Sequence, residues 1–166
     1  AHLVHQLLSL ARTEAEVALL PVDAAALARE VAREWTPRAV AAGVDLGYEG
    51  EESLMVPADK LLLREALSNL LDNAIRYAGR GTTVTLRALR RDGQCVLEVE
   101  DNGPGLSPSD LQHVFERFWR ASEMPGGCGL GLAIVAEIAQ RHGGAAIALG
   151  AHPQGLLIRL QLRGTL

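Results

Sequence analysis

The sequence predicts an α+β fold, a two-layer sandwich in which helices pack on one face of a sheet. Two stretches of alternating apolar and polar residues, each folding back through a short turn, predict β-hairpins with one solvent-facing side. Helical periodicity occurs between the strands, but without the strict strand–helix alternation of a parallel sheet. The length of 166 residues is that of one compact domain with a single core.

Composition excludes several classes of protein. With 48% hydrophobic and 22% charged residues, the chain is neither disordered nor collagen-like nor a coiled-coil rod. A formal charge of −4 argues against nucleic acid as a partner, because no basic field attracts phosphate backbones. Cys95 and Cys128 form no CxxC pair, which predicts a reducing compartment without disulfides or a zinc site. No apolar run reaches the roughly 18 residues of a membrane span, and no signal-peptide layout opens the chain.

The first twenty residues carry an amphipathic helical stripe that runs from Leu3 to Ala11 and ends before Pro21. No capping residue precedes it, so it is interpreted either as the end of a longer helix that pairs with a partner or as a frayed terminus. Asp23 is placed to cap a second helix that reaches about Ala42. The residues expected on the buried side of that helix are Leu27, Val31 and Trp35.

Further strands and helices are predicted along the rest of the chain. Two short strands, Val44–Tyr48 and Leu54–Val56, flank an acidic turn. One hairpin joins residues 82–89 and 95–100 through Asp92-Gly93, and a second turns at residues 152–155. The remaining helices are expected at Leu61–Ala78, from Pro108 to about Phe118 with Phe115 and Phe118 on its core side, and from Gly129 to about His142.

The helix at residues 61–78 has an unusual polar face. Five polar side chains share an arc of roughly 100° opposite the apolar face. They are Glu65, Asn69, Asp72, Asn73 and Arg76. An ordinary solvated face typically carries Lys, Glu and Gln, whereas asparagine is a poor helix former. Two asparagines one turn apart beside an arginine therefore favour a ligand, since amide oxygens suit Mg²⁺ and guanidinium suits phosphate.

Asp101 is expected on the apolar side of its strand, because it alternates with Leu97 and Val99. A carboxylate in that position is costly unless something bonds to it. Gly103 and Gly105 follow directly, and glycine lets the backbone approach a ligand closely. An isolated Asp-Asn-Gly also fits a β-turn closed by the aspartate. The inward direction of Asp101 favours a recognition site over that alternative.

A second glycine-rich segment, residues 126–132, leads into an apolar helix. Such a loop presents backbone N–H groups and the positive end of the helix dipole to an anion, typically a phosphate. The spacing is not that of a P-loop, and the segment does not follow a strand as a dinucleotide-binding GxGxxG loop does. Cys128 within it has no adjacent base in the sequence and is not predicted to be a nucleophile.

In this order, the segments resemble the ATP-binding catalytic domain of bacterial sensor histidine kinases, a branch of the family that includes gyrase, MutL and heat-shock chaperone ATPases. The matching segments are residues 67–78 (LSNLLDNAIRYA, asparagine box), 99–107 (VEDNGPGLS, first glycine box), 114–120 (VFERFWR, phenylalanine box) and 126–135 (GGCGLGLAIV, second glycine box). The resemblance implies the Bergerat fold, in which three helices cover one face of a mixed, mostly antiparallel sheet. It also implies a flexible ATP lid, here a short one from about Ala121 to Gly126.

Roles for individual residues follow from the resemblance. It implies that Asp101 accepts a hydrogen bond from the adenine amino group, in a pocket shaped by Gly103, Gly105 and Leu106. It implies that Asn73 holds Mg²⁺. Asn69 is expected near the phosphates and metal as a catalytic residue. Arg120, which would reach the terminal phosphate, is the second expected catalytic residue. The remaining nucleotide contacts are expected from Arg76, Tyr77, Gly127, Gly129, Leu130, Gly131 and Leu132.

The implied activity is transfer of the γ-phosphoryl group of ATP to a histidine on a dimerisation domain, and onward to a response regulator. In hydrolytic relatives a glutamate occupies the place of Asn69 and activates water, so a gyrase-type hydrolase is disfavoured. A module that only binds nucleotide and signals through its lid is the alternative. None of the five histidines is followed by the acidic residue of the acceptor motif.

The chain is therefore interpreted as a monomeric fragment without the phosphoacceptor. Residues 1–20 are assigned to the end of the dimerisation and phosphoacceptor helix, and residues 21–166 to the ATP-binding catalytic domain. The whole protein is expected to be a membrane-anchored homodimer, with this domain on the cytoplasmic side of a bacterial inner membrane.

Overall fold

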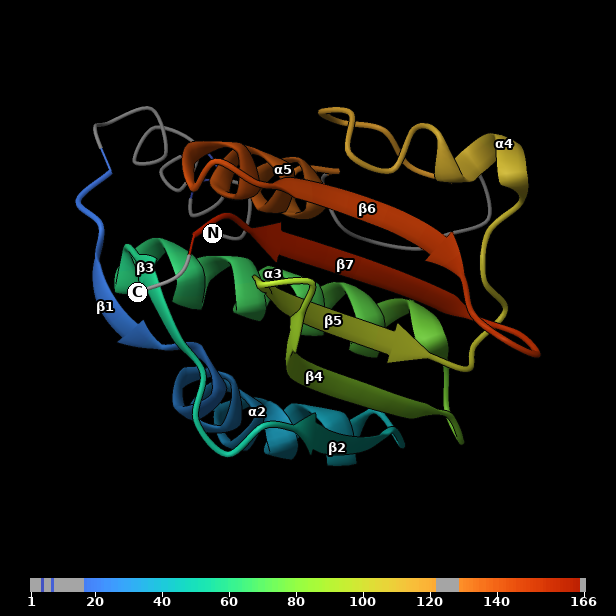
Figure 1. Ribbon diagram of the computed structural model, residues 1–166. Helices are drawn as coiled ribbons and strands as arrows, with labels where there is room; N and C mark the ends of the chain where they lie inside the picture. Colours follow the sequence, from blue (N-terminus) through green and yellow to red (C-terminus); the bar gives the residue numbers. More distant parts are fainter. Residues whose placement is uncertain (1–3, 5–6, 8–16, 122–128, 165–166) are drawn as a thin grey trace.

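The computed structural model describes residues 4, 7, 17–121 and 129–164, and it has two layers, with helices on one face of a five-stranded sheet (Figure 1). The strands lie in the order β2 (Asp45–Gly50), β4 (Thr83–Arg91), β5 (Gln94–Asp101), β7 (Leu156–Leu162) and β6 (Ala145–Gly150). Neighbouring strands pair antiparallel, except β2 and β4, which run parallel. The predicted α+β class and the mixed, mostly antiparallel sheet are confirmed.

Three long helices form the second layer: α2 (Ala24–Ala41), α3 (Lys60–Ala78) and α5 (Gly131–Arg141). Helix α3 contacts both α2 and α5. Asp23 caps α2, as predicted, by accepting the N–H groups of Ala25 and Ala26 at 3.1 Å. Asp59 caps α3 by accepting the Leu62 N–H at 3.1 Å.

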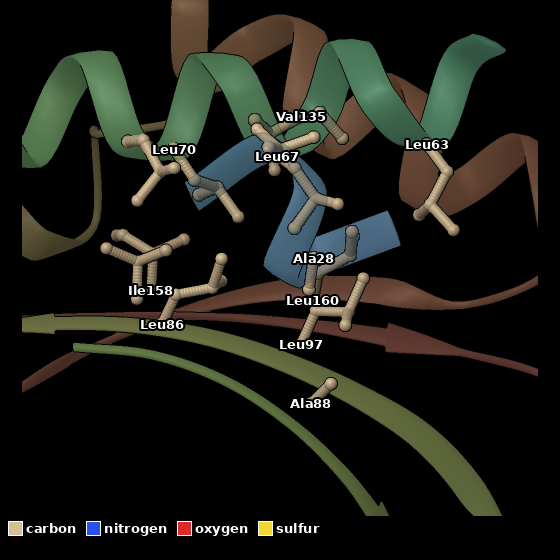
Figure 2. Close-up of a cluster of buried hydrophobic side chains, with 14 of the residues drawn as sticks. Ala28, Leu63, Leu67, Leu70, Leu86, Ala88, Leu97, Val135, Ile158 and Leu160 are labelled. Carbon is tan, nitrogen blue, oxygen red and sulfur yellow. The ribbon is translucent and has the colours of Figure 1, made fainter. Parts of the chain in front are cut away.

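The core lies between α3 and the sheet. Leucines at i, i+4 and i+7 spacing project from α3 toward apolar side chains of β4, β5 and β7 (Figure 2). These residues are Leu63, Leu67 and Leu70 on the helix, and Leu86, Leu97, Ile158 and Leu160 on the sheet. Burial of each such side chain contributes roughly 1.5–3 kcal/mol. Because this face of α3 is committed to the core, its polar face points away from the sheet.

Both predicted hairpins are confirmed. In the β4–β5 hairpin Arg91 pairs with Gln94, and the two turn residues, Asp92 and Gly93, have φ values of 52° and 78°. The β6–β7 hairpin turns through residues 151–155.

The predicted strand near residues 54–56 is β3 (Met55–Ala58), and it does not join the main sheet. It pairs antiparallel with β1 (Leu20–Asp23) in a separate two-stranded sheet. The other predicted strand, β2, begins one residue later than expected and forms an edge of the main sheet.

The prediction of a helix from Pro108 to Phe118 is wrong beyond Leu111. Helix α4 spans only Pro108–Leu111, and the next residues form turns. Phe118 adopts a φ of 66°, and its N–H donates to the Gly129 carbonyl at 2.9 Å. Its backbone therefore does not continue a helix, and its side chain is 62% exposed instead of lying in the core. Phe115 does pack against the core, where it is half-buried.

Trp35 packs against the core, as predicted, and is half-buried, with the Arg38 guanidinium 4.3 Å from its ring centroid. Burial corrects one further expectation. The sheet face opposite the helices is not wet throughout, because Val96 and Glu98 on β5 are only 1% and 3% exposed.

The N-terminal stripe predicted for residues 3–11 lies outside the described residues, apart from Val4 and Leu7, which are helical. Across residues 17–121 and 129–164, no helix combines the length and apolarity needed to cross a membrane.

Candidate functional site

Asp101 ends β5 with its side chain on the helix side of the sheet, as the alternation predicts, and is 7% exposed. Its Oδ1 accepts the N–H of Gly103 at 2.9 Å and the N–H of Leu156 at 3.4 Å. Among the described residues, none donates to Oδ2. Burial raises the pKa of this carboxyl against the two backbone hydrogen bonds, and Glu100 adds to the increase. One oxygen is thus fixed by the protein, and the other can accept a bond from a ligand.

The loop after Asp101 packs its glycines against backbone of the same chain. A Cβ on Gly103 would lie 2.6 Å from the carbonyl oxygen of Ala78, at the end of α3. Gly105 has a φ of 71°, and a Cβ there would lie 2.7 Å from the Gly155 carbonyl oxygen. The sequence predicts that these glycines admit a ligand. The structure shows that they admit the end of α3 and the β6–β7 turn.

The polar arc of α3 forms one continuous face. Asn69 is 7% exposed, and its Nδ2 donates to the Glu65 carbonyl at 3.0 Å. Arg76 Nη2 pairs with the Asp72 carboxylate at 3.2 Å, one turn away. Asn73 follows Asp72 directly, one turn after Asn69, and is half-buried. The face therefore offers amide and guanidinium groups within two turns of helix.

The chemistry of this donor set fits Mg²⁺. The ion prefers hard oxygen ligands, and it commonly takes one or two from protein while keeping water and phosphate oxygens. The Asn73 amide is such a ligand, and no described residue hydrogen-bonds to its side chain. Asn73 is therefore a residue of α3 whose amide oxygen could hold the ion, with Asn69 one turn earlier.

Helix α5 runs antiparallel to α3. His142, just after α5, accepts the backbone N–H of Asp59, just before α3, at 3.0 Å through Nε2. From this contact the two helices extend side by side (Figure 1). At about 1.5 Å per residue, the 11 residues of α5 place its first turn beside the middle of α3. Asn69 and Asn73 lie in that part of α3.

The N-terminus of α5 has no side-chain cap. Leu130, at the N-cap position, is buried and makes no capping bond, and Gly131 begins the helix. Gly129 has a φ of 74°, and a Cβ there would lie 2.6 Å from the carbonyl carbon of Phe118. Leu132 is half-buried against the core. Uncapped N–H groups in the first turn of a helix are donors for an anion such as phosphate.

The other predicted site residues have varied positions. Leu106 and Tyr77 are half-buried, and Leu106 packs against the core. Arg120 is exposed. Gly127 and Cys128 lie outside the described residues, as does the predicted lid after Ala121.

Two residues of this region are not assigned a site role by sequence reasoning. His142 is buried: its Nε2 accepts the Asp59 N–H at 3.0 Å, and its Nδ1 lies 2.8 Å from the Ile138 carbonyl oxygen. The His-Gly-Gly sequence at residues 142–144 is a local pattern from which the position of His142 after α5 could have been predicted. Gln154 donates to the Gly103 carbonyl at 2.8 Å. No local pattern signals Gln154, because its partner lies 51 positions away.

Comparison with known proteins defines the class. The family described as "Histidine kinase-, DNA gyrase B-, and HSP90-like ATPase" matches residues 58–165, and the chain belongs to this family. Within it, the chain is an ATP-binding catalytic domain of the bacterial histidine kinase type.

Individual relatives include proteins named as sensor proteins and as sensor histidine kinases. The sensor protein IrlS of Burkholderia pseudomallei (strain K96243) is 36% identical over 151 residues, which are 87% of this chain and 32% of IrlS. Full-length ShkA, solved in complex with AMPPNP, is 34% identical with a TM-score of 0.84 over 96% of this chain and 35% of ShkA. The mycobacterial sensor histidine kinase MprB is 31% identical with a TM-score of 0.78 over 86% of this chain and 97% of the solved chain. The chain spans about a third of the length of the curated relatives it matches.

Proposed function

We propose that this chain binds ATP and Mg²⁺ as the catalytic domain of a two-component sensor histidine kinase. In this proposal the γ-phosphoryl group passes to a histidine of a dimerisation domain outside the chain, and then to a response regulator. The observation that carries the proposal is Asp101, a buried carboxylate with one oxygen held by backbone N–H groups and the other able to accept from a ligand. Gly103, two residues after Asp101, packs against Ala78 at the end of α3, the helix that carries Asn73.

The adenine ring is recognised at Asp101. Oδ2 accepts a hydrogen bond from the exocyclic amino group, and a bond to a charged acceptor is worth roughly 1.5–3 kcal/mol. Gly103 and Gly105 hold the loop around the base, and half-buried Leu106 provides apolar contact. Tyr77, in the last turn of α3, lies toward the ribose.

The phosphates lie between the first turn of α5 and the polar face of α3. The N–H groups that follow Leu130 donate to phosphate oxygens, and Arg76 and Arg120 provide positive charge. Asn73 holds Mg²⁺ through its amide oxygen. When bound, the ion stabilises the negative charge that develops on the phosphate oxygens during transfer.

Asn69 supports transfer to a protein over hydrolysis. Its amide cannot take a proton from water, as a catalytic carboxylate does. Its Nδ2 already donates to the Glu65 carbonyl, which fixes the orientation of the amide on the helix. We therefore expect slow hydrolysis of ATP and reliance on an external imidazole as the nucleophile.

Incubation with γ-labelled ATP and Mg²⁺ tests the proposal. The chain alone should stay unlabelled, because in-line attack needs an imidazole held against the γ-phosphoryl group. A separately purified dimerisation domain with its acceptor histidine, added to the chain, should gain an acid-labile phosphate. Three histidines lie in the described residues: His113 is 3.0 Å from the Glu116 carboxylate, His142 is buried, and His152 is exposed in the turn between β6 and β7. None of the three is followed by the acidic residue of an acceptor motif.

Two outcomes contradict the proposal. Acid-labile label on a histidine of the chain alone would show that the acceptor is internal. ADP binding without label on any acceptor domain would favour a module that only binds nucleotide. The Asp101→Asn variant, assayed with the same acceptor domain, is the matched control and should transfer far less phosphate at limiting ATP.

The proposed setting follows from the sensor kinase relatives. We place residues 1–20 at the end of a dimerisation and phosphoacceptor helix, and residues 21–166 in the catalytic domain. The whole protein is proposed to be a membrane-anchored homodimer of the bacterial inner membrane, with this domain in the cytoplasm. The isolated chain is expected to be a monomer, which sedimentation analysis measures directly.

A further inference from the structure

We infer that Gln154 is a positioning residue for adenine recognition, because its side-chain amide holds the loop that carries Asp101. The inference rests on the proposed nucleotide function and adds a residue outside the segments that suggested it. Residues 101–105 are called the base loop below, and residues 151–155 the clamp turn. Gln154 Nε2 donates to the Gly103 carbonyl at 2.8 Å, which joins the two.

Backbone packing brings the clamp turn against the base loop. A Cβ on Gly155 would overlap the carbonyl oxygen of Asp101, and a Cβ on Gly105 would lie 2.7 Å from the Gly155 carbonyl oxygen. The N–H of Leu156, just after the turn, donates to Asp101 Oδ1 at 3.4 Å. The Ala151 N–H donates to the Gly155 carbonyl at 3.0 Å and closes the turn itself. The two segments therefore touch with no side chain between them.

Gly103 transmits the contact of Gln154 to Asp101. Its N–H donates to Asp101 Oδ1 at 2.9 Å, and its carbonyl accepts from Gln154. Glycine has more backbone freedom than any other residue, so the base loop needs external bonds to keep a single conformation. With both polar groups of Gly103 bonded, the orientation of the Asp101 carboxylate is fixed, and with it the direction of Oδ2.

The orientation of Oδ2 sets which base is accepted. The adenine amino group is a donor at the position where hypoxanthine has a carbonyl acceptor. A carboxylate held in one orientation accepts a hydrogen bond from the adenine amino group and repels the hypoxanthine carbonyl. A carboxylate free to rotate loses affinity for adenine and also discriminates less between the two bases. Gln154 therefore affects base selectivity without touching the nucleotide.

Three variants of the 166-residue chain test the inference. Gln154→Ala removes the donor. Gln154→Glu keeps the size of the side chain but turns an acceptor toward the Gly103 carbonyl. Gln140→Ala is the matched control, because Gln140 is an exposed glutamine on α5, away from the base loop. Titration calorimetry measures the dissociation constants of ADP and of inosine diphosphate with Mg²⁺, and thermal unfolding confirms that each variant is folded.

We expect Gln154→Ala to weaken ADP binding by roughly two- to tenfold, and Gln154→Glu by at least as much. The preference for ADP over inosine diphosphate should fall in both, while Gln140→Ala matches wild type. The inference is overturned if both Gln154 variants bind ADP like wild type, or if affinity for the two nucleotides falls in parallel. A wild-type chain that does not bind ADP overturns the proposed function instead.

Discussion

Glu98 and Asp101 lie three positions apart on β5, and both carboxylates are buried, but their surroundings differ. Glu98 faces away from the helices, where Arg159 Nε lies 2.7 Å from its carboxylate and Arg91 Nη1 lies 3.2 Å from it. Arg87 Nη1 is 3.8 Å away and also pairs with other glutamates. Asp101 faces the helices and, within the described part of the chain, accepts only backbone N–H groups.

The comparison separates a compensated charge from an uncompensated one. Burial alone would lower the pKa of Arg87, but the hydrogen bonds that it donates to Glu100 and Glu49 raise it. The arginines and glutamates around Glu98 therefore stabilise one another's charges. At Asp101 burial dominates, and the pKa is raised above the ordinary aspartate value. A buried carboxylate with neutral donors and no cation costs stability when ionised, and such costs concentrate at functional sites. On this argument Glu98 serves folding, and Asp101 serves binding.

The largest effect is expected from Glu98→Ala. Removing the carboxylate leaves three arginines around one another, and we expect the free energy of unfolding to fall by about 2–4 kcal/mol. Urea unfolding measures this change. Glu100→Ala is the matched control: Glu100 pairs with Arg87 but is partly exposed, so its loss should cost at most about 1 kcal/mol. A folded Glu98→Ala protein should bind ADP like wild type, and a large loss of affinity would contradict the division of roles.

Asp101→Asn should lower ADP affinity without lowering stability, the opposite of Glu98→Ala. We expect ADP affinity to fall by roughly ten- to hundredfold, because an amide replaces a charged acceptor. The thermal midpoint should rise, since the buried charge is gone while the amide oxygen can still accept from Gly103. Calorimetric titration and thermal unfolding measure the two quantities. Asp45→Asn, at an exposed position on β2, is the control and should change neither. Unchanged ADP affinity in a folded Asp101→Asn protein would refute the assignment.

Asn73→Ala should affect the metal more than the base. We expect the gain in ADP affinity on adding Mg²⁺ to shrink roughly fivefold, because one oxygen ligand of the ion is lost. Affinity measured in EDTA should stay near the wild-type value, since Asp101 and its loop are intact. Ser68→Ala on the same helix is the control. Equal losses with and without Mg²⁺ would mean that Asn73 contributes to the nucleotide pocket but not to the metal site.

The smallest effect is the dependence of stability on pH. Burial raises the pKa of Asp23, but bonds from the Leu54 and Ala26 N–H groups, the Ser53 hydroxyl and the Ala25 N–H lower it below its ordinary value. The pKa of Asp23 is lower in the folded chain than in the unfolded chain, so ionised Asp23 stabilises the protein at pH values above the unfolded pKa of about 3.9. This stabilisation is lost as the pH falls through the folded pKa.

The contribution of Asp101 to the pH dependence of stability has the opposite sign to that of Asp23. Its folded pKa is raised, so its ionisation removes stability as pH rises from the unfolded value through the folded one. The stability gain of Asp101→Asn should therefore be full at pH 7 and vanish below about pH 4. The stability loss of Asp23→Asn should also shrink on acidification. Urea unfolding between pH 7 and pH 3 measures both, and a gain for Asp101→Asn that persists at pH 3 would contradict its electrostatic origin.

Features with a local cause could be predicted from the sequence. Alternation with period two was sufficient to direct Asp101 toward the helices, and helical periodicity placed Asn69 and Asn73 on one face of α3. The cap at Asp23 and the turn at Asp92-Gly93 follow from the chemistry of those residues alone. Each of these depends on backbone geometry within a few residues.

Features with a distant partner required the folded chain. The helix expected at residues 108–118 ends at Leu111, and the Phe118 N–H donates to the distant Gly129 carbonyl, while β3 pairs with β1 outside the main sheet. Glu98 is buried on a face expected to be wet because Arg159, 61 positions away, covers it. Gln154 reaches Gly103 across 51 positions. Alternation and periodicity describe only which way a residue points, whereas burial and charge compensation depend on which distant segment the fold brings against it.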